Sequence, residues 1–223
     1  MPTSTMSQVS TIMSLVGEIK PASVIDVGIG YGKYGFLCRE LLEFMGGAPP
    51  RFSTMDDTQT AQESAVVIDG IEAYEESVTP LHRLIYGRLF VGDALEMLPT
   101  IATKTYDLAL AIDILEHFEE PDGRRFIAEL VRVARAVIIA TPRDMAVQGA
   151  VHGNEWETHR AEWSKAMLLE TGARLVVRTA ESWIGVYGDT PEVSAMVWQH
   201  SWGGRIPKFP GKRFLGALRR RLK

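Results

Sequence analysis

Three glycines spaced two residues apart follow directly on a short apolar run near the start of the chain. The run is Val24-Ile25-Asp26-Val27, and the glycines are Gly28, Gly30 and Gly32. This pattern is typical of a buried strand that turns tightly into a helix whose first backbone N–H groups face outward. It therefore predicts an α/β fold with a pocket for an anionic or polar cofactor after the first strand.

Length and composition favour one globular domain. The chain has 223 residues, of which 46% are hydrophobic and 23% charged, as in ordinary soluble proteins. It has no apolar run near 18 residues and no signal peptide pattern, so we expect a cytoplasmic protein. The single cysteine, Cys38, cannot form an internal disulfide and fits a reducing compartment.

The charge is divided unevenly along the chain. Residues 205–223 carry eight Lys and Arg and no acidic residue, which leaves 16 basic and 28 acidic side chains in residues 1–204. We therefore expect a cofactor-binding domain over 1–204 and a basic tail over 205–223. Because phosphate binding requires a basic face, the acidic body excludes a nucleic-acid partner.

The basic tail leaves several roles open. Residues 212–223 have apolar and basic positions that fit a short amphipathic helix, which could contact an anionic membrane surface. The tail could equally dock on the acidic surface of a neighbouring subunit or remain disordered. Removal of residues 205–223 would abolish vesicle binding under the first interpretation only. The number of subunits is not indicated by the sequence.

Apolar runs alternate with helical patterns along the chain. This alternation predicts a mostly parallel seven-stranded sheet with helices on both faces, in a single Rossmann-like domain. The polar stretch at 46–65 is predicted to be a loop, either a lid or disordered. The expected strands are 24–27, 66–72, 89–91, 106–112, 136–142, 174–178 and 194–198, and the expected helices include 6–19, 33–44, 124–135 and 162–171.

The glycine pattern admits two cofactors. Gly30, Gly32 and Gly35 match the dinucleotide fingerprint, which requires an acidic residue about 20 positions further on, at the end of a second strand. That position falls in the polar stretch, where no apolar strand leads into it. The first convincing second strand ends instead at Glu72. A nicotinamide-dependent oxidoreductase thus remains an alternative that competitive binding of the two cofactors would test.

Four segments in the expected order resemble the class I S-adenosylmethionine (SAM)-dependent methyltransferases over roughly residues 20–200. They are the glycine loop, the strand ending at Glu72, the strand ending in Gly92-Asp93-Ala94, and the strand 106–112 followed by Asp113. The resemblance implies SAM as the cofactor. Each residue also has a structural alternative, since glycines make tight turns and acidic residues begin helices.

The resemblance also assigns roles to these residues. The glycines would let the backbone approach the methionine part of SAM, and Asp26 would accept a hydrogen bond from its ammonium group, directly or through water. Glu72 would accept from the ribose hydroxyls and Asp93 from the adenine amino group. Asp113 would line the methionine or the acceptor. The residues expected to pack against adenine are Ile71, Ala94 and Leu95.

For the reaction, the resemblance implies a small-molecule acceptor, with O-methylation of a metabolite, sugar or envelope-glycan precursor favoured. A hydroxyl acceptor must lose a proton, and a histidine near neutral pKa is the usual helper. The candidates are His117, His152 and His159, each of which also suits a structural hydrogen bond. An N-methyltransferase and a catalytically silent SAM-binding regulator remain alternatives.

The acceptor pocket and the metal content are predicted from fewer residues. The segment 154–164 is similar to a loop that borders the acceptor in small-molecule methyltransferases. Trp156, Trp163, Trp183 and Tyr187, with the loop 46–65, could wall a pocket or form core. Some relatives that methylate catechols bind magnesium through clustered oxygen ligands. This chain has Asp113 but no Asp-Asn pair after the fifth strand, so no metal is expected.

Overall fold

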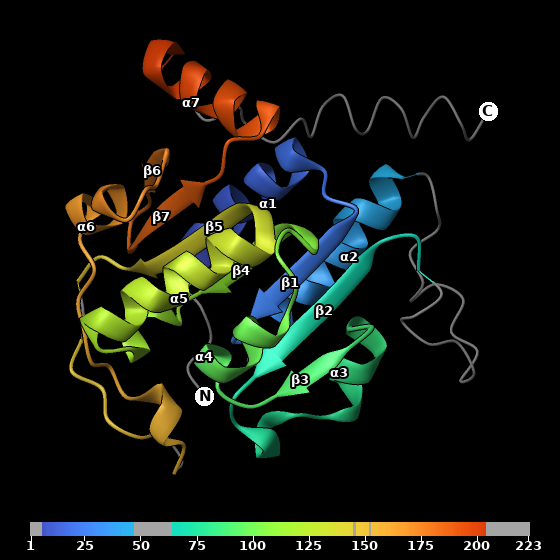
Figure 1. Cartoon of the computed structure of the whole chain (residues 1–223), viewed down its shortest axis with the longest axis vertical. Coiled ribbons are helices and arrows are strands. Elements are labelled where there is room, and N and C mark those ends of the chain that lie inside the picture. Colours follow the sequence, from blue (N-terminus) through green and yellow to red (C-terminus); the bar gives the residue numbers. More distant parts are fainter. Residues whose placement is uncertain (1–5, 47–63, 145, 152, 204–223) are drawn as a thin grey trace.

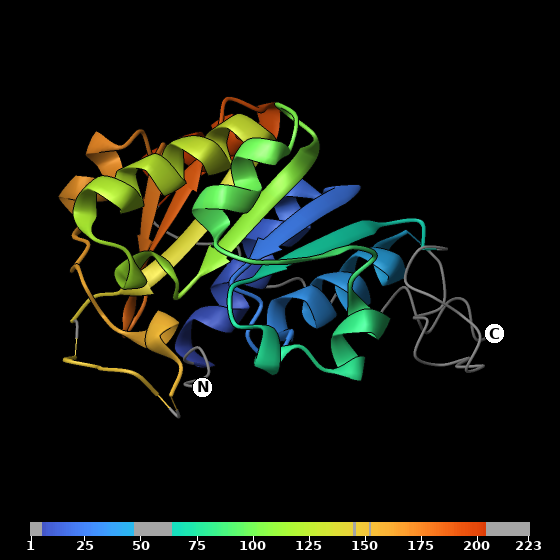
Figure 2. The same ribbon diagram turned by 60° about the horizontal axis from the view of Figure 1, so that its bottom comes forward.

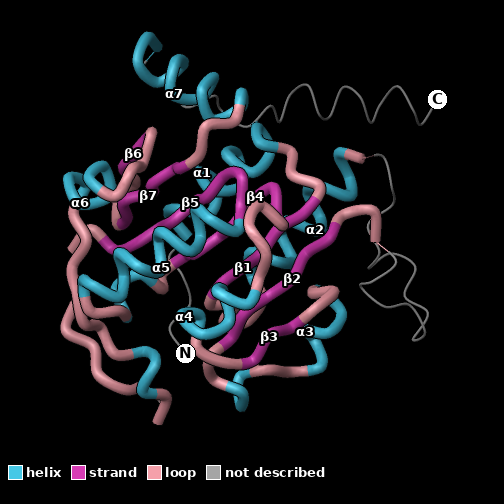
Figure 3. Tube along the Cα trace, viewed as in Figure 1, coloured by secondary structure: helices cyan, strands magenta, loops and turns pink. Residues whose placement is uncertain are grey.

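The computed structural model describes residues 6–46, 64–144, 146–151 and 153–203, and these form one sheet flanked by helices (Figure 1). The sheet has seven strands in the order β3-β2-β1-β4-β5-β7-β6. Figure 3 traces the strands as neighbours in one layer. The strands are β1 Ser23–Val27, β2 Val67–Glu72, β3 Leu89–Val91, β4 Tyr106–Ile112, β5 Ala134–Pro142, β6 Leu175–Arg178 and β7 Ser182–Tyr187.

Strand direction places one end of the sheet in position to bind a ligand. β1 to β5 are parallel, whereas β7 runs antiparallel to both of its neighbours, β5 and β6. β1 lies between β2 and β4, so the chain order reverses there. In open α/β sheets, such a switch point leaves a crevice at the carboxyl ends of the strands. The glycine loop that follows β1 lies at this crevice.

Helices cover both faces of the sheet, and each face has its own apolar core. In β5, Ala136, Ile138 and Ala140 belong to one core and Val137 and Ile139 to the other, as strand alternation requires. Figure 2 shows α2 and α3 on one side of the sheet and α4 and α5 on the other. The helices are α1 Met6–Ile19, α2 Lys33–Met45, α3 Pro80–Ile85, α4 Ala94–Met97, α5 Glu120–Val133, α6 Lys165–Glu170 and α7 Pro191–Gly203.

The sequence of α5 explains its position. Acidic residues and a proline occupy its first turn, where they suit the exposed N–H groups and the helix dipole. Phe126, Ile127, Leu130 and Val133 are buried along one side. That spacing gives the helix one apolar face, which packs on the sheet. Short 3₁₀ turns complete the connections: η3 Glu75–Ser77, η4 Leu98–Thr100, η5 Leu115–His117 and η6 Glu155–Glu157.

The predicted mostly parallel seven-stranded α/β sheet is confirmed, but its last strand was misplaced. Residues 194–198 lie in α7, and the seventh strand is Ser182–Tyr187. In this helix Val193 and Met196, three residues apart, face the core, while Trp198 is 64% exposed. That is helical spacing. The strand itself was obscured by Gly185 and by the short turn that joins it to β6.

Three predictions concern residues outside those that the structure describes. They are the loop over most of 46–65, His152 and the basic tail at 205–223. Among the described residues, no helix has both the length and the hydropathy needed to cross a bilayer.

Candidate active site

A cavity of about 250 Å³ lies at the carboxyl ends of β1, β2 and β4. Five segments that are far apart in the sequence line it. They are the glycine loop within 27–34, the end of β2 at 71–73, the start of α4 at 92–95, the stretch after β4 within 112–122, and residues within 154–160. The predicted cofactor segments therefore meet at one place.

The glycine loop has a backbone that only glycine adopts readily. Gly28, Gly30 and Gly32 have φ angles of +74°, +52° and +79°. At Gly28, a Cβ atom would lie 2.7 Å from the Cδ1 of Ile114. The Gly28 N–H donates to the carbonyl of Ile71 at 2.9 Å, which ties the loop to the end of β2. Gly28 and Gly30 line the cavity, whereas Gly32 precedes the first turn of α2.

Glu72 joins the glycine loop to the end of β2. Its Oε2 accepts from the N–H of Gly30 at 3.2 Å and its Oε1 from the N–H of Tyr74 at 3.0 Å. Burial raises the pKa of Glu72, and these two backbone donors oppose the rise. The side chain lines the cavity. Each carboxylate oxygen has a second lone pair, so Glu72 can accept further hydrogen bonds from a ligand.

Asp26 is buried and is not among the residues that line the cavity. The hydroxyl of Tyr86 donates to its Oδ2 at 2.7 Å. Burial raises the pKa of Asp26 to about 6, and the Tyr86 hydrogen bond opposes the rise. The structure therefore places Asp26 outside the cavity wall, where it holds Tyr86.

Asp93 lines the cavity and also caps α4. Its Oδ1 accepts from the N–H of Leu95 at 2.9 Å, as an N-cap residue does. Capping of α4 by Asp93 is thus compatible with a role for this residue at the cavity. Ile71 and Ala94 are both buried and line the same wall, together with Leu95.

Asp113 follows β4 with a φ of +53°, which is uncommon for a residue other than glycine. Its N–H continues the sheet by donating to the carbonyl of Ala140 at 2.9 Å. Its Oδ2 accepts from the side-chain amide of Gln8 at 2.6 Å, and Asp113 lines the cavity. Left-handed backbone of this kind is often found at functional sites.

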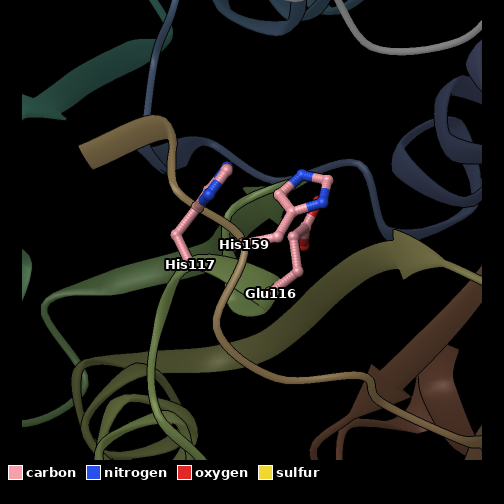
Figure 4. A group of neighbouring side chains, drawn as sticks. All are labelled: Glu116, His117 and His159. Carbon is pink, nitrogen blue, oxygen red and sulfur yellow. The ribbon is translucent and has the colours of Figure 1, made fainter. Parts of the chain in front are cut away.

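The structure brings two of the predicted histidines together. His117 lines the cavity and His159 lies beside it, with ring centroids 5.2 Å apart (Figure 4). Nδ1 of His117 lies 3.1 Å from the carbonyl of Thr158, and because a carbonyl only accepts, this nitrogen carries the proton. Burial lowers the pKa of His117 to about 4, so the ring is neutral near pH 7.

His82 is a further site residue that the sequence did not reveal. The N–H of Thr79 donates to its Nδ1 at 2.9 Å, so Nε2 carries the proton and donates to the carbonyl of Gly30 at 2.8 Å. The buried ring thereby fixes the glycine loop from α3. The Thr79-Pro80 pair is a helix-start signal that could have placed His82 in a first turn.

Known structures have the same arrangement of elements. The PH0226 protein of Pyrococcus horikoshii OT3 is 16% identical, with a TM-score of 0.51, over 85% of this chain and 96% of that chain. The methyltransferase domain of bacterial CtHen1-CN is 16% identical, with a TM-score of 0.50, over 82% and 98%. The N-terminal domain of EvdMO1, solved with SAH bound, is 13% identical, with a TM-score of 0.50, over 82% and 80%. The chain has the class I methyltransferase fold.

At the level of sequence, no protein-family model and no curated protein matches the chain. Identities of 13–16% establish the fold of a methyltransferase and not its substrate. The substrate side of the site must therefore be argued from the residues themselves.

The predicted aromatic wall of the methyltransferase-like cavity is only partly correct. Trp156 lines the cavity, but Trp163 and Tyr187 are core residues with almost no exposed surface. A Cβ on Gly123 would collide with the Trp163 ring, so α5 packs directly on this indole. Trp183 lies 5.4 Å from the guanidinium of Arg143 and is not among the lining residues. The remaining aromatic lining residues are Tyr31, Tyr34 and Phe118.

The charge of the cavity is the last feature of the site. Of the residues that the structure describes, two basic side chains line it, Lys33 and Arg160. The acidic lining residues in the same described part of the chain are six: Glu72, Asp93, Asp113, Glu119, Asp122 and Glu157. The negative electrostatic field of this lining attracts a ligand with a net positive charge and repels a phosphorylated one.

Proposed function

We propose that the chain is an enzyme that binds SAM in this cavity and transfers its methyl group to an oxygen atom of a small molecule. The excess of carboxylates around a glycine loop carries the proposal. SAM has an ammonium group, a sulfonium and one carboxylate, and so a net positive charge. A nicotinamide dinucleotide instead brings a negative pyrophosphate, which this cavity would repel.

The lining residues suit the parts of SAM in the order in which the strands present them. We assign Glu72 to the ribose hydroxyls and Asp93 to the adenine amino group, with Ile71 and Ala94 against the ring. Asp26, which does not line the cavity, is assigned to a positioning role through its hydrogen bond with Tyr86. SAH bound to the EvdMO1 domain, which shares the fold, agrees with this choice of cofactor.

Methyl transfer requires alignment and exclusion of water more than reactive side chains. When bound, SAM supplies a methyl group on a sulfonium that any aligned nucleophile can attack. Alignment of the reacting atoms alone can lower the activation barrier by about 7–11 kcal/mol. Ile71, Ile114 and Phe118 give the cavity an apolar wall. We expect an acceptor hydroxyl to be activated through His117, the only predicted histidine among the lining residues that the structure describes.

The acceptor class is proposed on chemistry and charge. An acidic cavity disfavours nucleic acid and phosphorylated acceptors, and favours neutral hydroxyl compounds such as a sugar, a metabolite or an envelope-glycan precursor. Cytoplasmic location belongs to the same proposal, because SAM and such precursors are made there.

The test is to incubate the full chain with SAM labelled in its methyl group and with a small-molecule extract, and to identify labelled products by mass spectrometry. The proposal predicts SAH release and an O-methylated product. An N-methylated product would show that the acceptor atom is nitrogen and not oxygen. Binding of SAM without SAH release from any extract would indicate a regulatory protein, and failure to bind SAM would overturn the proposal.

A further inference from the structure

Three side chains that could hold a metal ion cluster at the edge of the cavity. Glu116 and His117 belong to η5, and His159 follows η6, 42 residues after His117. Each offers one ligand atom, and the three atoms lie within 4.8 Å of one another. Figure 4 shows the Glu116 carboxylate next to the His159 ring, with His117 beside them.

Both histidines are oriented by backbone carbonyls. Nδ1 of His117 lies 3.1 Å from the carbonyl of Thr158, and Nδ1 of His159 lies 2.7 Å from that of Ala146. A carbonyl only accepts hydrogen bonds, so each Nδ1 carries a proton, and in the neutral ring the lone pair available to a metal is on Nε2. Metal-binding histidines are commonly held in this way, because the bond fixes both the tautomer and the ring direction.

Glu116 is a buried carboxylate. It is 2% exposed, and the hydroxyl of Thr141 donates to its Oε2 at 3.2 Å. The charged groups that act on it most strongly are the carboxylates of Asp113 and Glu157. Within the described part of the chain, it forms no salt bridge with Lys or Arg. Ionisation of a buried carboxyl group needs a compensating charge, which a bound cation would supply.

The two segments that carry the cluster are fastened to each other by backbone hydrogen bonds. The carbonyl of Glu116 accepts from the N–H of Arg160 at 2.8 Å and from that of Ala161 at 3.2 Å. The N–H of His159 donates to the carbonyl of Gln148 at 3.0 Å. The backbone on both sides of the cluster is thus fixed without a metal, as a preorganised site requires.

We propose that Glu116, His117 and His159 bind one divalent transition-metal ion. Two imidazoles and a carboxylate suit Zn²⁺ or Mn²⁺, whereas Mg²⁺ and Ca²⁺ prefer oxygen ligands alone. Ligands on tetrahedral zinc are about 3.4 Å apart when bonds are near 2.1 Å, so side-chain shifts of about 1 Å would close the site. This inference replaces the expectation from the sequence that no metal is bound.

Three protein ligands leave a coordination position open, and His117 borders the cavity, so an acceptor oxygen can fill that position. This step rests on the proposed function. A bound metal lowers the pKa of a coordinated hydroxyl, whose proton passes to water. The oxygen then forms a bond to the methyl carbon as the carbon–sulfur bond breaks, and sulfur keeps the electron pair in neutral SAH. His117 and His159 are then ligands and not bases.

The binding test uses the full chain freed of metal with a chelator and titrated with Zn²⁺, Mn²⁺ and Mg²⁺ by calorimetry. We expect one Zn²⁺ or Mn²⁺ per chain and much weaker Mg²⁺ binding. Glu116→Gln and His159→Ala are expected to weaken binding at least about 10–100-fold, the loss found even for groups that only orient ligands. Visible absorption of bound Co²⁺ reports histidine ligation without any enzymatic activity.

His200→Ala is the matched control. Nδ1 of His200 also lies against a carbonyl, that of Met196 at 2.9 Å, but the residue is in α7 and outside the cluster. Its variant is expected to bind Zn²⁺ as the wild type does. Equal affinity in the wild type and in folded Glu116→Gln would overturn the metal site. SAH binding measured on the same samples separates the two proposals. Loss of Zn²⁺ binding with SAH binding retained would affect the metal site alone, and loss of SAH binding with Zn²⁺ binding retained would affect the cofactor site alone.

Discussion

At the scale of single residues, Glu72 combines loop anchoring with ligand binding. We expect Glu72→Gln to weaken SAH binding about 10–100-fold, because a hydrogen bond to a charged group contributes about 1.5–3 kcal/mol. The single amide oxygen can still accept from one of the two backbone donors, the N–H of Gly30 or that of Tyr74, so we expect the fold to survive. Calorimetry with SAH checks this, and Glu75→Gln in exposed η3 is the control. An unchanged affinity in Glu72→Gln would remove Glu72 from the cofactor site.

The raised pKa of Asp26 predicts how the stability of the fold depends on pH. Its pKa rises from 3.8 to about 6 on folding, so the native state binds a proton more tightly than the unfolded state. Its favourable contribution is present below pH 4 and is lost as the pH rises to about 6. A shift of about two units corresponds to about 3 kcal/mol.

Asp26→Asn removes this titration. The free energy of unfolding of the variant minus that of the wild type is therefore expected to be about 2–3 kcal/mol larger at pH 7 than at pH 4, because only the wild type loses stability over this range. Urea unfolding of the ligand-free proteins at the two pH values measures the difference. If the two proteins lose stability in parallel, the carboxyl is not the group that titrates.

At the scale of elements, α3 acts on the cofactor loop without lining the cavity. His82→Ala removes the donor to the carbonyl of Gly30 and leaves it unsatisfied, at a cost of about 1–3 kcal/mol. We expect SAH affinity to fall about 10-fold, and His82→Gln, which can both donate and accept, to restore part of it. Hydrogen exchange of the loop amides is expected to speed up in the alanine variant. An effect on stability without any on SAH affinity would contradict this role.

The sequence predicted the parallel strands well because their runs of Val, Ile, Leu and Ala are buried on both faces. It predicted a strand where the structure has α7. The apolar run around Val193 and Met196 covers about five residues, too few to tell a helical period from that of a strand. For a related reason, the sequence left Trp163 open between a pocket wall and the core. An indole reads the same in a pocket wall and in a core, and only contact with Gly123 decides between them.

The candidate site was likewise predicted from the sequence only in part. Glu72, Asp93 and Asp113 follow strand ends, so local sequence located them at the cavity. His82 and the pairing of His117 with His159 depend on how distant segments pack, which no local pattern encodes. Asp26 lies close to the glycines in sequence, yet its side chain accepts a hydrogen bond from Tyr86 and does not line the cavity.

At the scale of the whole molecule, the cavity exists only when the sheet has formed. Its five segments come from residues 27 to 160, so the unfolded chain offers no comparable site. A ligand that binds only the folded state stabilises it in proportion to the logarithm of its concentration relative to the dissociation constant. Thermal unfolding therefore reports which cofactor the intact fold accepts.

We expect SAH at 100 times its dissociation constant to stabilise the fold by about 2.7 kcal/mol. For a domain of this size, each kcal/mol raises the Tm by about 2–4 °C, which gives a shift of about 5–11 °C. NADH at the same concentration is expected to give no shift, because the six carboxylates that line the cavity would repel its pyrophosphate. Glu72→Gln at the wild-type SAH concentration is expected to shift less. A shift with NADH and none with SAH would favour an oxidoreductase, and the acidic cavity would then need another explanation.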